Sequence, residues 1–353
     1  MKSLKDYSLN IPDTQYHDYP AWSHSLIARY AREGFSAVST IHEHTAPSPS
    51  MEFGSLFDSI LTKGTKTLDE YVIDTTNTSV PPAEASVFDK LLSMNCTAEF
   101  DDLHETVLQQ AIDACPTFQS KYKKPETRLE KLEAFKDYYN IRRTGKKIVS
   151  KQDWDDAVEM VRVFRQDEYL KKLFSTKNTK DKEYLYQTQY LVDITLDDGR
   201  TVKFKFMPDL LVVNHKDKTI QPVDLKTSSE PAYNFTDNFL RFRYDIQASS
   251  YTEGLQTLIN GIPEYSDYNI LPYLFTDISR TDKVPVTYIY DPREDSQIDG
   301  LSYGEAYTVK YKGWKQLLAE LLDYEESNAR VPSNITTKGP NDILSLLAAR
   351  RKY

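Results

Sequence analysis

The stretch FMPDLLVVNHKDKTIQPVDLKT, residues 206–227, decides the fold of this chain. Runs of Leu, Val and Ile flank a polar turn at 215–218, which is typical of two neighbouring β-strands. Upstream, the Asp-Gly at 198–199 is a strong hairpin signal between two further β-rich runs. We therefore expect an antiparallel meander with strands at 184–195, 201–213 and 219–226.

Two carboxylates lie on this meander. Asp209 falls in the second strand, and Asp224 falls fifteen residues later in the third, with one turn between them. Adjacent strands bring such side chains together, and two carboxylates at close range repel unless they share a cation, for which Mg²⁺ or Mn²⁺ is suited. Because side chains alternate along a strand, Lys226 points to the same face as Asp224. Its ammonium can orient or help deprotonate a water and offset charge on a phosphate.

A helix expected at 241–259 carries Gln247 and Tyr251 one turn apart on one face. Packed beside the sheet edge, this helix would aim both side chains at the metal or the phosphate. Taken singly, an Asp-x-Lys is most often a surface ion pair, and a Gln-x-x-x-Tyr is most often ordinary helix. The order and spacing of these pieces after a turn-rich meander favour one site.

Pro208-Asp209, Asp224-Leu225-Lys226 and Gln247-x-x-x-Tyr251 together resemble the PD-(D/E)XK nuclease superfamily. The Gln-x-x-x-Tyr element is similar to its RecB-like branch, and within it to the RecE-type exonucleases of phages, distantly related to lambda exonuclease. The Arg243-Tyr244-Asp245-Ile246 approach and the helix beginning near Gly54 fit the same order. The resemblance covers residues 20–64 loosely and 150–260 well.

The resemblance implies a role for each residue of the motif. Asp209, Asp224 and the backbone carbonyl of Leu225 would hold Mg²⁺ or Mn²⁺. Lys226 would be the catalytic lysine, and Gln247 and Tyr251 would complete the site.

The chain departs from the family pattern at two places. Members often carry a Gly-x-x-x-His on the first helix, whereas here Gly54 is followed by Asp58, which is a further candidate metal ligand or an exposed helix residue. Some relatives place a Glu on the strand before the Pro-Asp. Here that strand offers Gln187 and Gln189, of which we favour Gln189 as the metal-site counterpart.

Residues 121–151 contain eleven basic and four acidic side chains, interleaved with aromatic residues, and carry a local charge of +7. This composition suits a nucleic-acid backbone and its bases, but it equally fits a solvated helical face. We expect DNA contacts from this stretch and from an arginine near the start of the Gln-bearing helix. The candidates are Arg142, Arg143, Lys146, Lys147 and Arg243.

Composition limits the alternatives. The chain has 353 residues, a net charge of −9 and two cysteines, Cys96 and Cys115, too few for a Cys₄ metal site. It shows no phosphate-binding loop, no apolar run long enough to span a membrane and no secretory signal, so we expect the cytoplasm, that of the host cell if a phage encodes it. No metal-spaced pair is formed by His24, His42, His44, His104 and His215, which are scattered along the chain.

The expected fold class is α/β (mixed): a restriction-endonuclease-like core with a central mixed sheet of about four to five strands, flanked by helices and carrying helical insertions. We expect one domain over 1–353. Its core would be 51–64 and 150–290, with a helical insertion at 65–150 and a C-terminal helical extension at 300–353. Helices are also expected at 22–35, 51–64, 153–174 and 314–327.

These expectations point to a Mg²⁺- or Mn²⁺-dependent deoxyribonuclease. As in the family it resembles, it would be an exonuclease that resects double-stranded DNA ends for recombination by single-strand annealing in a phage. Its partners would be DNA ends, a single-strand annealing protein and further copies of itself, and no membrane. Two alternatives stay open: a structure-directed or nicking endonuclease on the same core, and a DNA-binding or virion-associated protein whose site has decayed.

Overall fold

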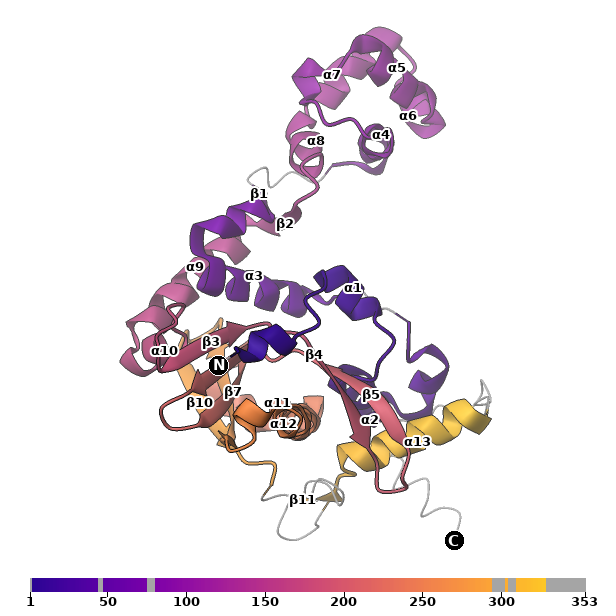
Figure 1. The fold of residues 1–353 in the computed structure, drawn as a ribbon. Coiled ribbons are helices and arrows are strands. Elements are labelled where there is room, and N and C mark those ends of the chain that lie inside the picture. Colours follow the sequence, from indigo (N-terminus) through magenta and orange to yellow (C-terminus); the bar gives the residue numbers. More distant parts are fainter. Residues whose placement is uncertain (1, 44–46, 75–79, 294–301, 304–308, 328–353) are drawn as a thin grey trace. The chain divides into compact units, whose positions relative to one another are not determined.

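The computed structural model describes residues 2–43, 47–74, 80–293, 302–303 and 309–327 (Figure 1). The chain divides into two compact units: Met1–Gly54 with Arg162–Tyr353, and Ser55–Val161. The fold class is mixed α/β, as expected. The second half of the expected C-terminal extension, 328–353, lies outside the described residues.

The first unit is built on a mixed sheet whose main path runs β10-β9-β7-β6-β3. Strand β7 lies centrally: it is antiparallel to β6 and parallel to β9, and β8 pairs with its first two residues. The strands are β3 (Lys182–Tyr186), β6 (Leu210–Asn214), β7 (Thr219–Ser228), β8 (Asn269–Ile270), β9 (Tyr273–Ser279) and β10 (Pro285–Tyr290).

The expectation of continuous strands at 184–195 and 201–213 was wrong. Each run is divided, and the second half of the first run, β4 (Tyr190–Thr195), pairs with the first half of the second run, β5 (Thr201–Phe206), in a separate two-stranded sheet. The breaks occur at the same level of neighbouring strands. Gln187 adopts a positive φ of 44°, and Pro208 has no N–H to donate to a strand partner. The hairpin β4–β5 therefore leaves the main sheet just before β6, at Asp209.

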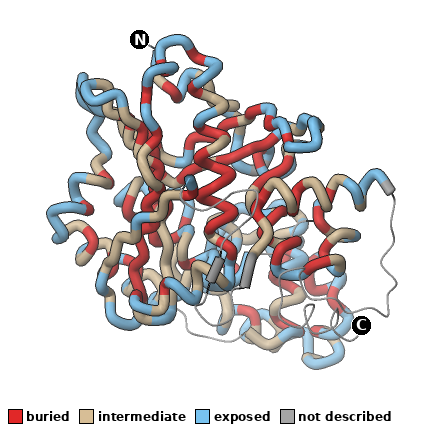
Figure 2. The backbone as a smooth tube through the Cα atoms, turned by 90° about the horizontal axis from the view of Figure 1, so that it is seen from below, coloured by how far each residue is buried: buried red, intermediate tan, exposed pale blue. Residues whose placement is uncertain are grey.

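Helix α12 (Tyr244–Asn260) is the central helix of this unit, and buried residues occur around most of its circumference (Figure 2). It packs against α2 (His24–Glu33), α13 (Trp314–Ser327) and β4. The helix expected at 314–327 is thus confirmed with the expected ends, and the one expected at 22–35 is confirmed with shifted ends. Most of the one expected at 241–259 is α12, which begins after a break at Arg243. The one expected at 153–174 is divided at Asp167, whose side chain caps a second helix.

The remaining elements of the first unit are short. They are η1 (Leu4–Tyr7), α1 (Asp13–Asp18), η2 (Gly34–Thr40), α10 (Glu168–Leu173), η6 (Ala232–Asn234), α11 (Phe235–Phe242), η7 (Pro263–Tyr265), β11 (Ser302–Tyr303) and β12 (Val309–Lys310).

The second unit is mainly helical around its own apolar core, which includes Phe88, Phe100 and Tyr139. Two strands, β1 (Tyr71–Asp74) and β2 (Lys147–Ser150), pair in parallel. The helices are α3 (Pro49–Lys63), which begins in the first unit, η3 (Gly64–Asp69), α4 (Pro82–Ser93), η4 (Phe100–Asp102), α5 (Glu105–Asp113), α6 (Pro116–Lys121), η5 (Pro125–Thr127), α7 (Arg128–Glu133), α8 (Lys136–Arg142) and α9 (Lys151–Gln166), which ends in the first unit.

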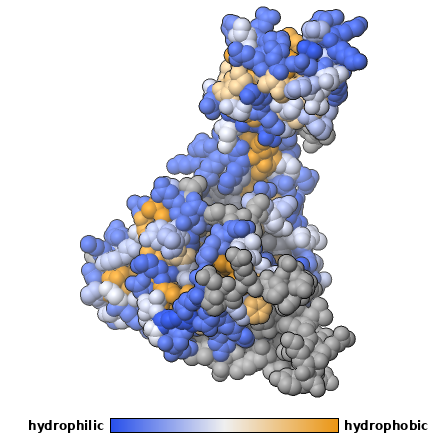
Figure 3. All heavy atoms as spheres, turned by 90° about the vertical axis from the view of Figure 1, so that its right-hand side faces the viewer, coloured by the Kyte–Doolittle hydropathy of each residue, from blue (hydrophilic) through white to orange (hydrophobic). Residues whose placement is uncertain are grey.

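The described residues on the face shown in Figure 3 are largely hydrophilic. The large exposed apolar side chains of the described residues include Tyr233 and Ile289. Within the part of the chain that the structure describes, none of the helices is both long and apolar enough to cross a membrane.

Gly254 lets α12 approach β5 closely, so Gly254→Ala is expected to destabilise the first unit. A Cβ at this position would lie 2.8 Å from the buried Phe206 ring. We expect a loss of about 1–3 kcal/mol in the free energy of unfolding, although Ala favours helix. Urea unfolding followed by Trp22 and Trp314 fluorescence, in a Trp154→Phe background, reports on the first unit alone.

The matched control is Gly261→Ala, where the nearest atom to an added Cβ is a carbonyl oxygen at 3.4 Å. Equal stabilities of the two variants would contradict the close approach of α12 and β5.

Candidate active site

Asp209 and Asp224 come from neighbouring strands. Leu210 at the start of β6 pairs with Val223 of β7, so the next pair outward is Asp209 with Asp224, on one face of the sheet. The Asp209 carboxylate accepts a hydrogen bond of 2.7 Å from the backbone N–H of Leu225. The structure therefore brings together the two carboxylates that the sequence analysis placed on these strands.

Asp224, Lys226 and Gln247 contact one another. The Lys226 ammonium lies 2.6 Å from Asp224 Oδ2 and donates to Gln247 Oε1 at 3.1 Å. The amide nitrogen of Gln247 donates to the other Asp224 oxygen at 2.5 Å. Asp224 and Gln247 are buried, whereas the Lys226 side chain keeps 21% of its surface exposed. The Gln247 amide of α12 thus holds both the Asp224 carboxylate and the Lys226 ammonium of β7 in place.

The charge of Lys226 is set by opposing effects. Burial lowers its pKa, but the Asp224 carboxylate, the Tyr244 hydroxyl and the Asp209 carboxylate together raise the pKa above its usual value. The ammonium also lies 4.5 Å from the centre of the Tyr244 ring, a favourable cation–π distance. In this arrangement Lys226 holds its proton, so it is suited to offsetting negative charge rather than to accepting a proton from water.

The residues present fit a hard divalent cation. Asp224 Oδ2 is buried, and the structure gives it no aligned hydrogen-bond donor, although the Lys226 ammonium lies beside it. This oxygen already has one positive neighbour, and a divalent cation would bind it in place of, or beside, the ammonium. Among the described residues, no group of three or more His, Cys, Asp and Glu side chains forms a ready metal cluster. A metal here would use Asp209, Asp224 and the Leu225 carbonyl, which stay the predicted ligands.

Tyr251 lies one helical turn after Gln247 and closes the buried side of the site. Its side chain is 4% exposed, and its ring is 5.6 Å from that of Phe206 and 6.5 Å from that of Tyr273. Burial, followed by the charges of its surroundings, raises the pKa of Tyr251 well above its usual value. Its hydroxyl therefore stays protonated at neutral pH and serves as a neutral polar group.

His24 lies beside Tyr251, a neighbour that the sequence analysis did not predict. It is the first residue of α2, and its ring meets the Tyr251 ring edge-on, 5.0 Å away. Burial, then the charges of Lys226 and Arg32, lower its pKa well below the usual value, so the imidazole is neutral at pH 7. A neutral imidazole is the form that binds metals. The only sequence signal was a histidine at a helix start, 185 residues before Asp209, and nothing linked the two.

Gln189, favoured as a counterpart of the family's Glu, is instead occupied by the N-terminal residues. Its side-chain oxygen accepts from the Ile11 N–H, and its nitrogen donates to Asp13 at 2.9 Å. The residue beside the site is Gln187, which is exposed and whose N–H donates to the Asp209 carbonyl at 3.1 Å. Both glutamines lie in the break between β3 and β4, where strand alternation no longer holds. Gln187 therefore lies next to Asp209, whereas Gln189 lies against the N-terminal segment.

Arg243, which we expected to contact DNA, is buried. Its guanidinium forms two hydrogen bonds of 2.9 Å with Asp245 and donates to the Lys312 carbonyl at 2.7 Å. Its backbone is left-handed, with φ 58°, at the junction of α11 and α12. These contacts join α12 to the segment before α13, so the side chain has a structural place and is not presented to a DNA backbone.

The four basic candidates of the second unit are all engaged within that unit. Their partners are Asp89 and Tyr138 for Arg142, Glu99 for Arg143, the Leu68 carbonyl for Lys146 and the Tyr71 ring for Lys147. Exposed ion pairs are worth about 0–1 kcal/mol, so a phosphate could replace the acidic partners of Arg142 and Arg143. Their role in DNA binding stays a prediction, as does metal binding by Asp58, which also belongs to the second unit.

Asp277 is a second buried carboxylate on the same face as Lys226. It pairs with Lys226 in the parallel register of β7 and β9 and is 2% exposed. The Ser228 hydroxyl donates to the Glu230 carbonyl at 2.8 Å and, over a longer 3.4 Å, to the Asp277 carboxylate. Burial raises the pKa of Asp277 to about 6, with Asp282 adding to the rise and Ser228 and Lys226 opposing it.

We expect Asp277→Asn to stabilise the first unit at pH 8 but not at pH 4. The usual pKa is 3.8, so the folded state holds this proton more tightly than the unfolded chain. The contribution of protonated Asp277 to the free energy of unfolding is therefore fully present below about pH 4. It is lost as the pH rises through 6, by about 3 kcal/mol at most. The tryptophan fluorescence assay described for Gly254 measures it. Parallel pH profiles of wild type and variant would contradict it.

Comparison with known proteins adds little to this geometry. No family model matches the chain, and no curated protein matches it. Among the solved structures that match is one titled "Crystal structure of SSO0001", with 12% sequence identity, covering 70% of this chain and 88% of that chain, at a TM-score of 0.25. A TM-score this low carries no argument about fold or function.

Proposed function

We propose that this chain is a metal-dependent deoxyribonuclease with a restriction-endonuclease-like core, and that it degrades duplex DNA from its ends. The observation that carries the proposal is the contact of Gln247 with both Asp224 and Lys226. Lys226 and Gln247 are 21 residues apart, on a strand and on a helix, and the family resemblance implied that these two elements share one site. An Asp-x-Lys that formed only a surface ion pair would not contact a buried glutamine of another element.

The residues divide into those that hold a cation and those that act on the phosphate. Asp209, Asp224 and the Leu225 carbonyl would hold Mg²⁺ or Mn²⁺. When bound, the ion supplies the positive charge that activates a water and offsets charge on the phosphate. Lys226 keeps its proton and neutralises the charge that builds up on phosphate oxygens as water attacks. Gln247 orients Lys226 and Asp224 through one hydrogen bond to each, and Tyr251 excludes water from behind them.

In its biological setting, such an enzyme would resect duplex ends in a phage-infected cell. The product would be single-stranded DNA for a single-strand annealing partner. Further copies of the chain would enclose the DNA if the enzyme resembles ring-forming relatives of the family.

The test compares end-labelled linear duplex with a covalently closed circle, each with Mn²⁺ or with EDTA. We expect loss of the linear DNA alone, and only with Mn²⁺. Cleavage of the closed circle would show a structure-directed or nicking endonuclease. Loss of neither substrate, in Mg²⁺ or Mn²⁺, would point to a DNA-binding or virion-associated protein with a decayed site.

A further inference from the structure

An exposed aromatic ring, that of Phe242, lies next to the candidate active site. Phe242 is the last residue of α11 and is 37% exposed. Its ring stacks on that of Tyr244, with the ring centres 5.8 Å apart and the planes at 26°. The Tyr244 ring also stacks on the buried Phe275 ring of β9, and its centre lies 4.5 Å from the Lys226 ammonium. One ring therefore separates Phe242 from the proposed catalytic lysine.

A left-handed residue produces this stack. Side chains two residues apart on one helix do not face each other, so Phe242 and Tyr244 would diverge if α11 continued into α12. Arg243, which lies between them, has φ 58° and ψ 50° and breaks the helix at this point. A left-handed backbone costs free energy for a residue other than glycine. The buried ion pair of Arg243 with Asp245 holds the chain in this conformation and so keeps the two rings stacked.

Two arginines border the exposed ring. The Arg241 guanidinium lies 5.2 Å from the centre of the Phe242 ring, and Arg32 of α2 donates to the Phe242 carbonyl at 3.4 Å. Both arginines are exposed, and the structure gives neither of them an ion pair among the residues it describes. Arg142 and Arg143, by contrast, are both paired with acidic side chains. The positive charge beside Phe242 is therefore not neutralised by a partner within the described chain.

These four residues form what we call the aromatic platform: Arg32, Arg241, Phe242 and Tyr244. An aromatic ring binds any nucleobase by stacking, and a base also stacks on the plane of an arginine guanidinium. Unpaired arginines offset the charge of the phosphates on either side of the base. An apolar peptide would gain nothing from the two cations, and a small anion would gain nothing from the ring. The combination therefore suits a nucleotide.

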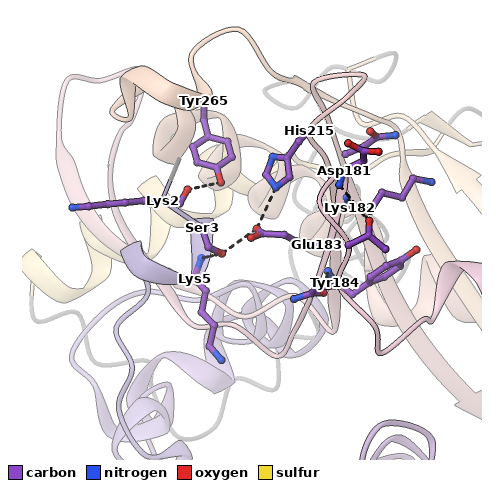
Figure 4. Close-up of polar contacts among 12 residues, drawn as sticks. Lys2, Ser3, Lys5, Asp181, Lys182, Glu183, Tyr184, His215 and Tyr265 are labelled. Carbon is purple, nitrogen blue, oxygen red and sulfur yellow. Dashed lines mark hydrogen bonds and ion pairs between the residues drawn. The ribbon is translucent and has the colours of Figure 1, made fainter.

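Another polar cluster of the first unit is different in kind. At the ends of β3 and β6 that lie away from Asp209, the Ser3 hydroxyl donates to Glu183 at 3.0 Å (Figure 4). The same Glu183 oxygen lies 3.6 Å from the His215 ring, whose other nitrogen contacts the Tyr268 hydroxyl at 2.9 Å. These groups are engaged with one another, so this cluster fixes the N-terminal residues to the sheet rather than binding a ligand.

We propose that the aromatic platform binds an unpaired nucleobase of the DNA substrate, next to the phosphate that Lys226 contacts. This inference rests on the proposed function and deepens it, because it names the part of the DNA that is held beside the catalytic lysine. A base inside a duplex is covered on both faces by its neighbours, so the base that stacks on Phe242 has left its place in the duplex. The inference therefore predicts binding to DNA ends that carry unpaired nucleotides.

Linear duplexes with a single abasic residue test this on the full chain. Their ends carry unpaired nucleotides of either polarity, and the abasic residue is moved one position at a time along these nucleotides and into the duplex. Binding is measured by fluorescence anisotropy in EDTA, and again with Ca²⁺, another hard cation that binds carboxylates, in place of Mn²⁺. Wild type is expected to bind the duplex that lacks the stacked base about fivefold to hundredfold more weakly than intact DNA.

Variants of Phe242 identify the ring on which the base stacks. Phe242→Ala should bind intact DNA more weakly by a similar factor and lose no further affinity for the abasic duplex, because the base then has no ring to leave. Phe242→Trp, which keeps an aromatic face, should retain the effect of the abasic residue. Tyr169→Ala is the matched control, since Tyr169 is an exposed aromatic residue of α10, and it should behave as wild type.

The outcomes separate this inference from the proposed function. Equal binding of intact and abasic duplexes by wild type would overturn the aromatic platform. An undiminished abasic effect in Phe242→Ala would also overturn it, because the base would then stack elsewhere. An abasic effect that needs Phe242, in a protein that cleaves no DNA with Mn²⁺, would support the platform and overturn the nuclease proposal. A wild type that binds DNA neither in EDTA nor with Ca²⁺ would overturn both.

Discussion

Replacing Asp224 with Asn is expected to abolish Mn²⁺ binding and DNA cleavage together. Asp224 is the buried carboxylate whose Oδ2 has the Lys226 ammonium beside it but no aligned donor, so it is the best-prepared cation ligand of the site. An amide supplies no charge and one fewer oxygen. Isothermal calorimetry with Mn²⁺ and digestion of end-labelled duplex measure the two losses.

The same substitution removes the strongest support for the charge of Lys226. The pKa of Lys226 is expected to fall, because burial then acts against a smaller set of opposing charges. A partner left unpaired in a mostly buried pair costs about 3 kcal/mol or more. Asp193→Asn is the matched control, since Asp193 is an exposed strand residue paired with Lys203 across β4 and β5. Wild-type Mn²⁺ affinity in Asp224→Asn would refute the assignment of Asp224 as a ligand.

Replacing Lys226 with Met is expected to separate metal binding from chemistry. Cleavage should fall by about a hundredfold to a thousandfold or more, because the charge that stabilises the transition state is lost. Mn²⁺ binding should be retained or become tighter, since the Lys226 ammonium lies 2.6 Å from the Asp224 oxygen that a cation would bind. Single-turnover rates and calorimetry on the same preparation measure both effects.

The control for this variant is Lys203→Met, a lysine on the exposed face of β5. Parallel losses of metal binding and cleavage in Lys226→Met would mean that Lys226 organises the site rather than stabilising charge. Undiminished cleavage would remove it from the mechanism.

The sequence predicted correctly the features that follow from local rules, such as the backbone preference of one residue type or the periodicity of one element. The Asp-Gly hairpin was located by Gly199, which has φ 87°, and strand alternation placed Asp224 and Lys226 on one face. Helical spacing placed Gln247 and Tyr251 on α12. These are local rules with a period of two or of 3.6 residues, and they do not depend on the rest of the fold.

What the sequence could not supply depends on contacts between distant segments. The matched breaks at Gln187 and Pro208 send β4 and β5 out of the main sheet, and neither residue alone predicts this. The place of His24 beside Tyr251 depends on the packing of α2 against α12, two helices far apart along the chain. Arg243 looked like a surface cation, but its partner is two residues away, and its burial depends on the segment before α13.

The basic stretch shows a further limit of local charge counts. A net of +7 over 121–151 predicted an exposed basic surface, yet acidic residues from 84–101 pair with several of these side chains in space. Charge summed along a sequence therefore overstates the field of a folded unit when the neutralising residues come from another helix.

The most direct test of the central claim is the Mn²⁺-dependent loss of end-labelled linear duplex by wild type and by Lys226→Met, measured in the same single-turnover assay. The site described here, with Lys226 held between Asp224 and Gln247, predicts rapid loss by wild type, none in EDTA, and loss slower by about a hundredfold or more in the variant. Equal rates in wild type and Lys226→Met, or digestion that persists in EDTA, would contradict it.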